Sequence, residues 1–399
     1  MKYIVILGDG MADFHRGVLG NKTPLELAKK PAIDRLAQLG QVGLIKTIDD
    51  GLKPGSDVAN LSVIGYDPKK YYTGRSPLEA LSVGVKMAEN DTVFRVNLVT
   101  LTYGSTLEEC TMLDYSAGEI STEEAHILMK ELDEQLGGGC IKFYGGTSYR
   151  NLALLPGSAC ETEFTPPHDI MDKKIGAYLP QGEGNTIFTN LMEKSMDILK
   201  NHPINIARIE QGKRIANSVW FWGKGTKPNL PSFQEMYNLK GAVISAVDLL
   251  KGIAIGCGMD VINVEGATGT LNTNFQGKAE ACVNALKDHD YVYVHIEAPD
   301  ECGHQGDAEG KILSIEKIDG MVEYIVNQLD ENKEEYCIAV LPDHPTPLIL
   351  RTHVSEPVPF LVYNSVRPSN SNLTYTETEG GKGIYLSNGR ALIQYMLKC

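Results

Sequence analysis

Several acidic, histidine and serine side chains follow apolar runs or tight turns, in four segments that are far apart in the chain. These residues are Asp9, Ser56, Asp300, His304, Asp343 and His344. In a parallel α/β sheet, functional sites gather beyond the carboxyl ends of the strands. We therefore expect the four segments to meet at one edge of a sheet.

The spacing of these residues predicts ligands for two ions. Asp300 and His304 are four residues apart, which suits two ligands of one ion if the segment forms a helical turn. Asp343 and His344 are adjacent, so their side chains diverge and could face two different ions. His353 follows closely and is the expected third member of this C-terminal set.

Carboxylates mixed with imidazoles favour Mn²⁺, Zn²⁺ or Co²⁺ over Ca²⁺. Two such ions about 4 Å apart clamp the attacking and leaving oxygens of a phosphoryl transfer. Ser56 would be the nucleophile, because a serine hydroxyl is weak until a metal lowers its pKa. Each segment alone is also typical of an ordinary turn, so the prediction depends on the joint pattern.

Alternating apolar runs and helical patterns predict an α/β fold with a parallel sheet. Apolar runs at 3–7, 291–296 and 336–341 indicate buried strands, and the pattern over 311–329 predicts a helix. Ser121 and Glu124 form a capping-box pattern before a helix in the middle of the chain. We expect a core formed by 1–90 and 179–399, with an inserted cap domain at 91–178. A strand at 218–222 is assigned to the core.

Composition excludes several classes of protein. The 399 residues carry a formal net charge of −14, which argues against binding to nucleic acid or to an anionic membrane. The eight cysteines form no Cys-x-x-Cys pair, a pattern that suits a reducing compartment, and we expect a cytoplasmic protein. The most apolar region, 241–262, is interrupted by charges and predicts no membrane span.

Several motifs resemble those of the cofactor-independent phosphoglycerate mutases, in their archaeal-type branch within the alkaline phosphatase superfamily. The resemblance runs nearly end to end. The motifs are Gly8-Asp9-Gly10-Met11, Gly55-Ser56-Asp57-Val58-Ala59-Asn60, Gly74-Arg75-Ser76-Pro77, Phe94-Arg95-Val96-Asn97, Gly266-Ala267-Thr268-Gly269, Pro299-Asp300-Glu301-Cys302-Gly303-His304 and Asp343-His344. It implies an alkaline phosphatase-like three-layer core with a mostly parallel sheet, plus an inserted small α+β cap.

The resemblance also implies roles for the site residues. One metal ion would be held by Asp9, Ser56, Asp343 and His344. The other would be held by Asp300, His304 and His353. The two divalent ions would be Mn, Zn, Co or Mg, with no 2,3-bisphosphoglycerate. Ser56 would carry the phosphoryl group while 3- and 2-phosphoglycerate interconvert, and the cap would exclude water.

A small phosphorylated substrate is the expected partner, and its charge must be met by cations. Arg75, Arg95 and Arg150 are the candidates, together with His168 after a Pro-Pro pair. A surface ion pair is the alternative explanation for each arginine. Lys278 is expected to begin a solvated helix. An oligomer is possible, but the sequence does not predict one.

The chain departs from the archaeal-type pattern at positions where arginines are expected. Tyr115 and Glu119 occupy two of them, and the segment 216–223 contains no arginine. The Tyr-Ser-Ala-Gly pattern at 115–118 resembles a subgroup proposed to be homoserine kinases, so transfer of phosphate from ATP to homoserine is the alternative function. A P-loop is absent. A non-catalytic relative is a third alternative, which would require a degraded site.

Overall fold

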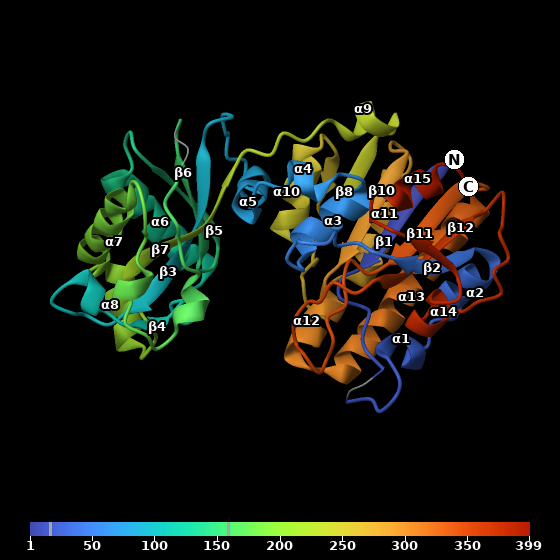
Figure 1. Ribbon diagram of the computed structural model, residues 1–399, viewed down its shortest axis with the longest axis horizontal. Helices are drawn as coiled ribbons and strands as arrows, with labels where there is room; N and C mark the ends of the chain where they lie inside the picture. The colour runs from blue at the N-terminus through green and yellow to red at the C-terminus, as the bar shows by residue number, and fades with distance from the viewer. Residues whose placement is uncertain (16–17, 158–159) are drawn as a thin grey trace. The chain divides into compact units, whose positions relative to one another are not determined.

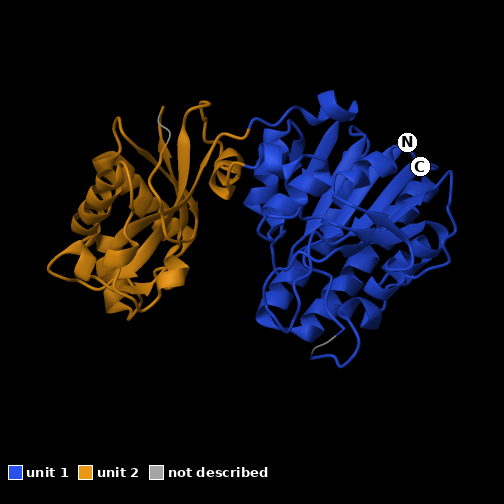
Figure 2. Ribbon diagram, in the orientation of Figure 1, with its two compact units in different colours: residues 1–72, 229–399 blue, residues 73–228 orange. Residues whose placement is uncertain are grey.

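The computed structural model describes residues 1–15, 18–157 and 160–399, which divide into two compact units. The first unit comprises Met1–Tyr72 and Asn229–Cys399, and the second comprises Thr73–Pro228 (Figure 2). The second unit is therefore an insertion in the sequence of the first.

The described part of the first unit contains an eight-stranded sheet of order β13-β2-β12-β11-β1-β10-β8-β9. All neighbouring strands are parallel except β12, which is antiparallel to β11 and β2. The expected mostly parallel α/β core is confirmed. The strands are β1 (Lys2–Gly8), β2 (Gln41–Ile45), β8 (Gly241–Ile244), β9 (Asp260–Ile262), β10 (Tyr291–Ile296), β11 (Tyr336–Leu341), β12 (Val358–Asn364) and β13 (Ile384–Leu386).

Helices cover both faces of this sheet (Figure 1). Helices α2 (Pro31–Leu39), α11 (Phe275–Ala285) and α13 (Ala308–Glu331) share one core cluster with Ile4 and Ile6 of β1. Successive residues of a strand point to opposite faces, so Val5 and Leu7 lie toward the other layer. Both are buried, which explains the continuous apolar runs of the central strands.

The other layer of the first unit includes α3 (Ser56–Ile64), α10 (Asp248–Gly256) and α15 (Ala391–Met396), where α10 and α15 both contact α3. The long helix predicted over 311–329 is present as α13. The remaining helices of this unit are α1 (Pro24–Leu27), α4 (Pro68–Tyr71), α9 (Phe233–Tyr237), α12 (Ala298–Gln305) and α14 (Glu377–Gly380).

In the second unit, the described residues form a five-stranded sheet in which each strand pair is antiparallel. Its strands are β3 (Thr92–Leu101), β4 (Met112–Asp114), β5 (Lys142–Thr147), β6 (Arg150–Leu155) and β7 (Ser218–Thr226). Its helices are α5 (Arg75–Ser82), α6 (Thr122–Leu136), α7 (Asn185–Leu199) and α8 (Pro203–Glu210), with short 3₁₀ turns at Leu107–Glu109, Pro167–Ile170 and Gly176–Tyr178. The predicted capping box of Ser121 and Glu124 begins α6.

The boundaries of the second unit differ from the expected 91–178, because the strand assigned to the core belongs to the insertion. This strand, β7, pairs with β3 along almost its whole length, from Thr92 opposite Thr226 to Val99 opposite Ser218. The side chain of Asn217 continues the pairing, since it both donates to and accepts from the backbone of Leu101. The segment 179–184, which follows the expected end of the cap, leads into α7 of the same unit.

No helix in the described ranges combines the length and the apolar character that a membrane crossing requires. All eight cysteines are free thiols.

The strand pairing predicts how fragments of the insertion will behave. A fragment of residues 73–228 should fold and unfold cooperatively, because it keeps both β6 and β7 paired with β3. A fragment of residues 91–178 lacks β7 and should remain largely unfolded. Circular dichroism with thermal denaturation distinguishes the two. A cooperative transition in the shorter fragment would contradict the assignment of β7 to this unit.

Candidate functional site

The functional segments follow three adjacent strands of the first unit. β1 lies between β10 and β11 and is parallel to both, so their carboxyl ends lie side by side. Asp9 follows β1 directly, α12 follows β10, and Asp343 and His344 follow β11. Gly10 has a φ of +63°, and a Cβ at this position would come within 2.6 Å of the Asp300 Oδ1 atom. The turn after β1 therefore requires glycine to let these segments converge.

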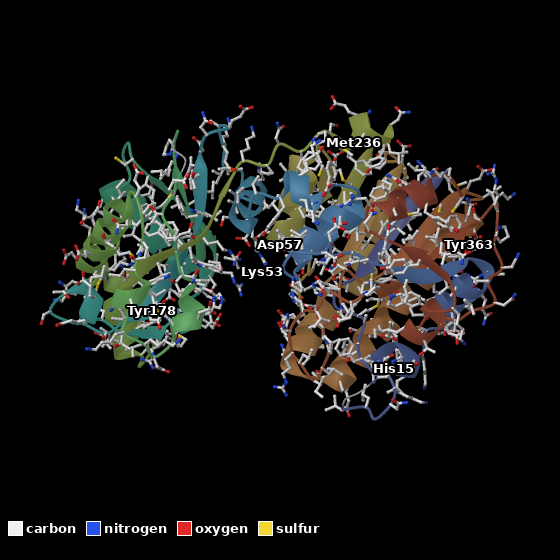
Figure 3. All side chains as sticks on the ribbon, in the orientation of Figure 1. His15, Lys53, Asp57, Tyr178, Met236 and Tyr363 are labelled. Atoms are coloured by element: carbon white, nitrogen blue, oxygen red, sulfur yellow. The ribbon has the colours of Figure 1, made fainter. Side chains whose placement is uncertain are left out.

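Ser56 is the first residue of α3 and points to the same place. Its Oγ atom lies 3.3 Å from Asp9 Oδ2 and 3.2 Å from His344 Nε2. The N-cap residue Gly55 has no side chain to cap α3, and the Val58 N–H donates to Asp57 Oδ1 at 2.9 Å. The N–H groups of Ser56 and Asp57 and the positive end of the helix dipole are therefore the groups available to an anion. Figure 3 labels Lys53 and Asp57, which bracket this segment in the chain.

The side chains expected to hold the first ion lie close together. His344 Nε2 lies 3.5 Å from Asp9 Oδ1 and 3.3 Å from Asp343 Oδ2. Asp9, Asp343 and His344 are all buried. Together with Ser56 they bring two carboxylates, one imidazole and one hydroxyl to one point.

The side chains expected to hold the second ion also lie together. Asp300 and His304 are on α12, where their spacing puts them on one face, and His304 Nε2 lies 3.2 Å from Asp300 Oδ2. His353 Nε2 lies 3.4 Å from Asp300 Oδ1 and 2.8 Å from His304 Nε2. The two imidazoles and the carboxylate converge through the atoms that bind metals.

The two groups are neighbours. The ring of His344 stacks on that of His353 with centroids 4.0 Å apart, and Asp9, Asp300 and His344 each offer a ligand atom within 4.8 Å of the others. Lys311 joins the segments that follow β1 and β11, since its buried ammonium donates to the carbonyls of Ala12 and Thr346. The spacing suits two ions that share one substrate group.

The electrostatics of the site fit bound cations. Burial and the nearby carboxylates of Asp343 and Asp300 raise the pKa of Asp9. The Oδ1 atom of Asp9 is buried and has no hydrogen-bond partner in the described part of the chain. A buried carboxylate oxygen without a donor is costly, and a divalent ion would remove that cost. The residues present therefore fit divalent metal ions.

Histidine pKa values differ within the site. Burial lowers the pKa of His344, whereas the hydrogen bond to Asp300 raises the pKa of His304 to about 9. Burial acts to raise the pKa of Asp300, but hydrogen bonds with His304 and His353 hold that pKa well below its usual range. The residues expected to hold the second ion are thus more strongly hydrogen-bonded to one another than the residues expected to hold the first.

Sequence reasoning missed a layer of buried polar residues behind the first group. His295 Nε2 lies 2.9 Å from Asp9 Oδ2, and Asn60 donates to Asp343 Oδ2 at 2.8 Å. Burial lowers the pKa of His295 to about 3. Asp9, His295 and Glu297 also form a group whose ligand atoms lie within 4.8 Å of one another. The sequence feature that could have indicated this layer is His295, a histidine within the apolar run at 291–296.

Two of the predicted substrate residues share a carboxylate in the second unit. Glu79 of α5 accepts from Arg75 Nε at 2.9 Å and from Arg95 Nη2 at 2.7 Å. Burial acts to raise the pKa of Glu79, but the two guanidinium charges outweigh it and lower the pKa. Both arginines are only partly buried. Ion pairs therefore hold them at the surface of the unit.

The other two predicted residues are linked to this pair through aromatic rings. Arg95 lies over the ring of Trp222, which contacts the ring of His168 at 5.3 Å between centroids. A further row of contacts runs from His168 through Tyr115 and Tyr149 to Arg150. We call this series, from Arg75 to Arg150, the cationic face. The structure thus connects all four predicted substrate residues within one unit.

The positions that depart from the archaeal-type pattern differ in their surroundings. Tyr115 packs between Tyr149 and His168 on the cationic face, whereas Glu119 is exposed. The expectation that Lys278 begins a solvated helix is wrong. Lys278 is 1% exposed, its ammonium donates to the His295 carbonyl, and burial lowers its pKa to about 8.

Two family models match the chain. Residues 37–205 match a model described as 2,3-bisphosphoglycerate-independent phosphoglycerate mutase. Residues 168–351 match one described as type I phosphodiesterase / nucleotide pyrophosphatase. Neither model alone covers half of the chain.

Curated relatives match over nearly the whole length. A protein of Methanosarcina barkeri named 2,3-bisphosphoglycerate-independent phosphoglycerate mutase is 50% identical, over 96% of this chain and 95% of its own. A protein of Geobacter sulfurreducens named a probable enzyme of this kind is 47% identical over 100% of both chains.

Two solved structures also match the chain over its whole length. A protein from Pyrococcus horikoshii has a TM-score of 0.84 at 31% identity, covering 100% of this chain and 96% of the other. A cofactor-independent phosphoglycerate mutase from Thermoplasma acidophilum has a TM-score of 0.69 at 25% identity, covering 100% of this chain and 99% of the other.

The grouping of ligands predicts the metal content of single variants. The wild-type protein, stripped of metal and then dialysed against Mn²⁺, should hold two ions per chain. Asp300→Ala and His344→Ala should each hold fewer, because each removes a converging ligand. Plasma mass spectrometry measures the content. Glu301→Ala, on the same helix as Asp300, is the control and should keep two ions. Unchanged content in both ligand variants would contradict the two-ion site.

Proposed function

The chain belongs to the family of 2,3-bisphosphoglycerate-independent phosphoglycerate mutases, and we propose that it interconverts 3- and 2-phosphoglycerate through a phosphoserine at Ser56. The observation that carries the proposal is the position of the Ser56 hydroxyl. It lies at an uncapped helix N-terminus, within 3.3 Å of Asp9 and His344, where the two ligand groups meet.

The reaction asks Ser56 to accept a phosphoryl group and then return it. The oxygen–phosphorus bond of the substrate breaks as the bond from Ser56 Oγ to phosphorus forms, and the serine proton ends on the released hydroxyl. Return of the phosphoryl group to the other hydroxyl of the glycerate restores the serine. The N–H groups of Ser56 and Asp57 at the start of α3 would stabilise the charge of the phosphoserine.

Divalent ions belong to this proposal. Asp9, Ser56, Asp343 and His344 would hold one, and Asp300, His304 and His353 the other, with Mn, Zn, Co or Mg as candidates. The ions would supply Lewis-acid activation of the Ser56 hydroxyl and neutralise charge on the transferred group. The family name states independence from 2,3-bisphosphoglycerate, and storage of the phosphoryl group on Ser56 is the chemical reason that no such donor is needed.

We further propose that the cationic face of the second unit binds the anionic groups of the substrate. Arg75, Arg95, Arg150 and His168 are the residues involved. Glu79 holds two of these arginines through its carboxylate, which pre-organises the guanidinium groups and reduces the entropy lost on binding.

Loss of the serine hydroxyl is the direct test of the mechanism. Ser56→Ala should lower mutase activity by a factor on the order of 10⁴ or more, because the nucleophile is removed. Activity is measured with 3-phosphoglycerate and Mn²⁺, and wild-type protein incubated with substrate should carry a phosphate at Ser56 in a mass spectrum.

A substrate panel with and without ATP separates the two candidate functions. Interconversion of the phosphoglycerates without ATP supports the mutase. A folded, metal-loaded protein that leaves both phosphoglycerates unchanged but forms O-phosphohomoserine from ATP and homoserine would overturn it. That second outcome would identify the homoserine kinase that the Tyr-Ser-Ala-Gly segment suggests.

The role of the cationic face is tested at Arg95. Arg95→Gln removes a charged donor, worth about 2 kcal/mol, and should lower kcat/KM about thirtyfold, mainly through KM. Steady-state kinetics give both constants. Lys130→Gln is the control, since Lys130 is an exposed cation of the same unit that lies outside the cationic face. Equal effects of the two substitutions would argue against a specific role for Arg95.

A further inference from the structure

One face of strand β10 carries three buried polar side chains behind the candidate metal site. Tyr291, Tyr293 and His295 alternate along the strand and so share this face, and all three are fully buried. His295 lies opposite Leu7 in the register with β1, next to the strand end that carries Asp9. A central strand of a parallel sheet is normally apolar on both faces, so this polar row needs an explanation.

The first hydrogen-bond chain from this face ends at Asp9. His295 Nε2 lies 2.9 Å from Asp9 Oδ2. Asp9 must be ionised to bind a metal ion, and an ionised carboxylate only accepts, so in the ion-binding state the imidazole donates from Nε2. Its Nδ1 then accepts from the hydroxyl of Ser245 at 3.2 Å. The Ser245 oxygen in turn accepts from the N–H of Val247 at 3.0 Å. The chain therefore has one consistent direction, toward the carboxylate.

The second chain ends at Asp343. The hydroxyl of Tyr293 donates to Asn60 Oδ1 at 2.6 Å, which sets the orientation of the amide. Asn60 Nδ2 then donates one hydrogen to Asp343 Oδ2 and the other to the Ser56 carbonyl, both at 2.8 Å. A single amide thus connects the serine that begins α3 to the carboxylate that follows β11.

We propose that Tyr293 and His295 are positioning residues that orient Asp343 and Asp9 toward the first metal ion. Each hydrogen-bond chain ends in a donor to one carboxylate oxygen, and this bond limits rotation of that carboxylate. The Oδ1 of Asp9, which has no hydrogen-bond partner within the described ranges, lies 3.5 Å from His344 Nε2, the imidazole that both carboxylates approach. This inference rests on the ion site of the proposed function, but it does not depend on the identity of the substrate.

Tyr291 supplies a matched control on the same strand and face. Its hydroxyl is buried and has no hydrogen-bond partner within the described ranges, and its ring packs on that of Phe233 with centroids 4.9 Å apart. Removal of this hydroxyl changes the same atoms as removal of the Tyr293 hydroxyl, but it breaks no chain to a carboxylate.

The test measures Mn²⁺ binding to metal-free protein by isothermal titration calorimetry, with thermal unfolding of the same metal-free samples. Hydrogen-bond partners of metal ligands contribute about 10- to 100-fold to metal affinity. Tyr293→Phe and His295→Leu should therefore weaken binding of one ion by about 10- to 100-fold. Tyr291→Phe should bind as the wild type does. His295→Gln should bind close to the wild type, since its amide N–H can replace the imidazole donor.

Several outcomes would overturn the inference. Wild-type affinity in Tyr293→Phe would do so, and this nearly isosteric variant remains informative if His295→Leu does not fold. A lower melting temperature with unchanged affinity would assign the two residues a purely structural role. Loss of a third ion in the His295 variants would make His295 a ligand, with Asp9 and Glu297. A wild-type protein that binds no Mn²⁺ would refute the proposed ion site as well, whereas Mn²⁺ binding without mutase activity would refute only the substrate assignment.

Discussion

Repulsion among buried carboxylates is the constraint on which the candidate site depends. Asp9, Asp300 and Asp343 lie beyond the ends of adjacent strands with almost no exposure to water. Burial, together with the charges of Asp343 and Asp300, raises the cost of ionising Asp9. Such a group is stable only if donors and cations compensate it. The surrounding features serve that purpose: two imidazoles around Asp300, the backbone N–H groups of Gly10 and His344 that donate to Asp343, and an uncapped helix start at Ser56.

The parallel sheet satisfies this constraint because it brings strand ends together without exposing backbone. β1, β10 and β11 are each followed by a segment of the candidate site at the same edge of the sheet. Helices on both faces shield the strands from water. The buried carboxylates at this edge require hydrogen-bond donors behind them. Asn60, Tyr293 and His295 form these hydrogen bonds, and an apolar side chain in place of any one of them would leave a partner unsatisfied.

The second unit solves the opposite electrostatic problem, which is to present cations at a surface. Glu79 binds two arginines at once, and Trp222 supports the guanidinium of Arg95 through its ring. The arginines that the archaeal-type pattern leads one to expect at 115 and 119 are absent, yet the chain belongs to the mutase family. Tyr115 instead contributes an aromatic link between His168 and Tyr149. Membership of the family therefore does not require arginines at positions 115 and 119.

Local patterns in the sequence were sufficient to select candidate ligands and to predict the elements that carry them. Asp300 and His304 fall on one face of a helix because their spacing matches a helical turn, and the capping box at Ser121 marks the start of α6 in the same way. These features depend on residues only a few positions apart. The class of the fold followed from the alternation of buried strands and helices for the same reason.

Only the tertiary structure decided which strands pair and which polar groups meet. Strand β7 has an ordinary strand pattern, but its partner β3 lies more than a hundred residues earlier, so the pattern alone did not assign it to the insertion. Likewise, Asn60 and Tyr293 are 233 positions apart, and no local pattern relates them. The sequence predicted a solvated Lys278, whereas its ammonium donates to the buried carbonyl of His295. Periodicity encodes the exposure of a residue within its own element, whereas contacts between distant elements depend on how those elements pack.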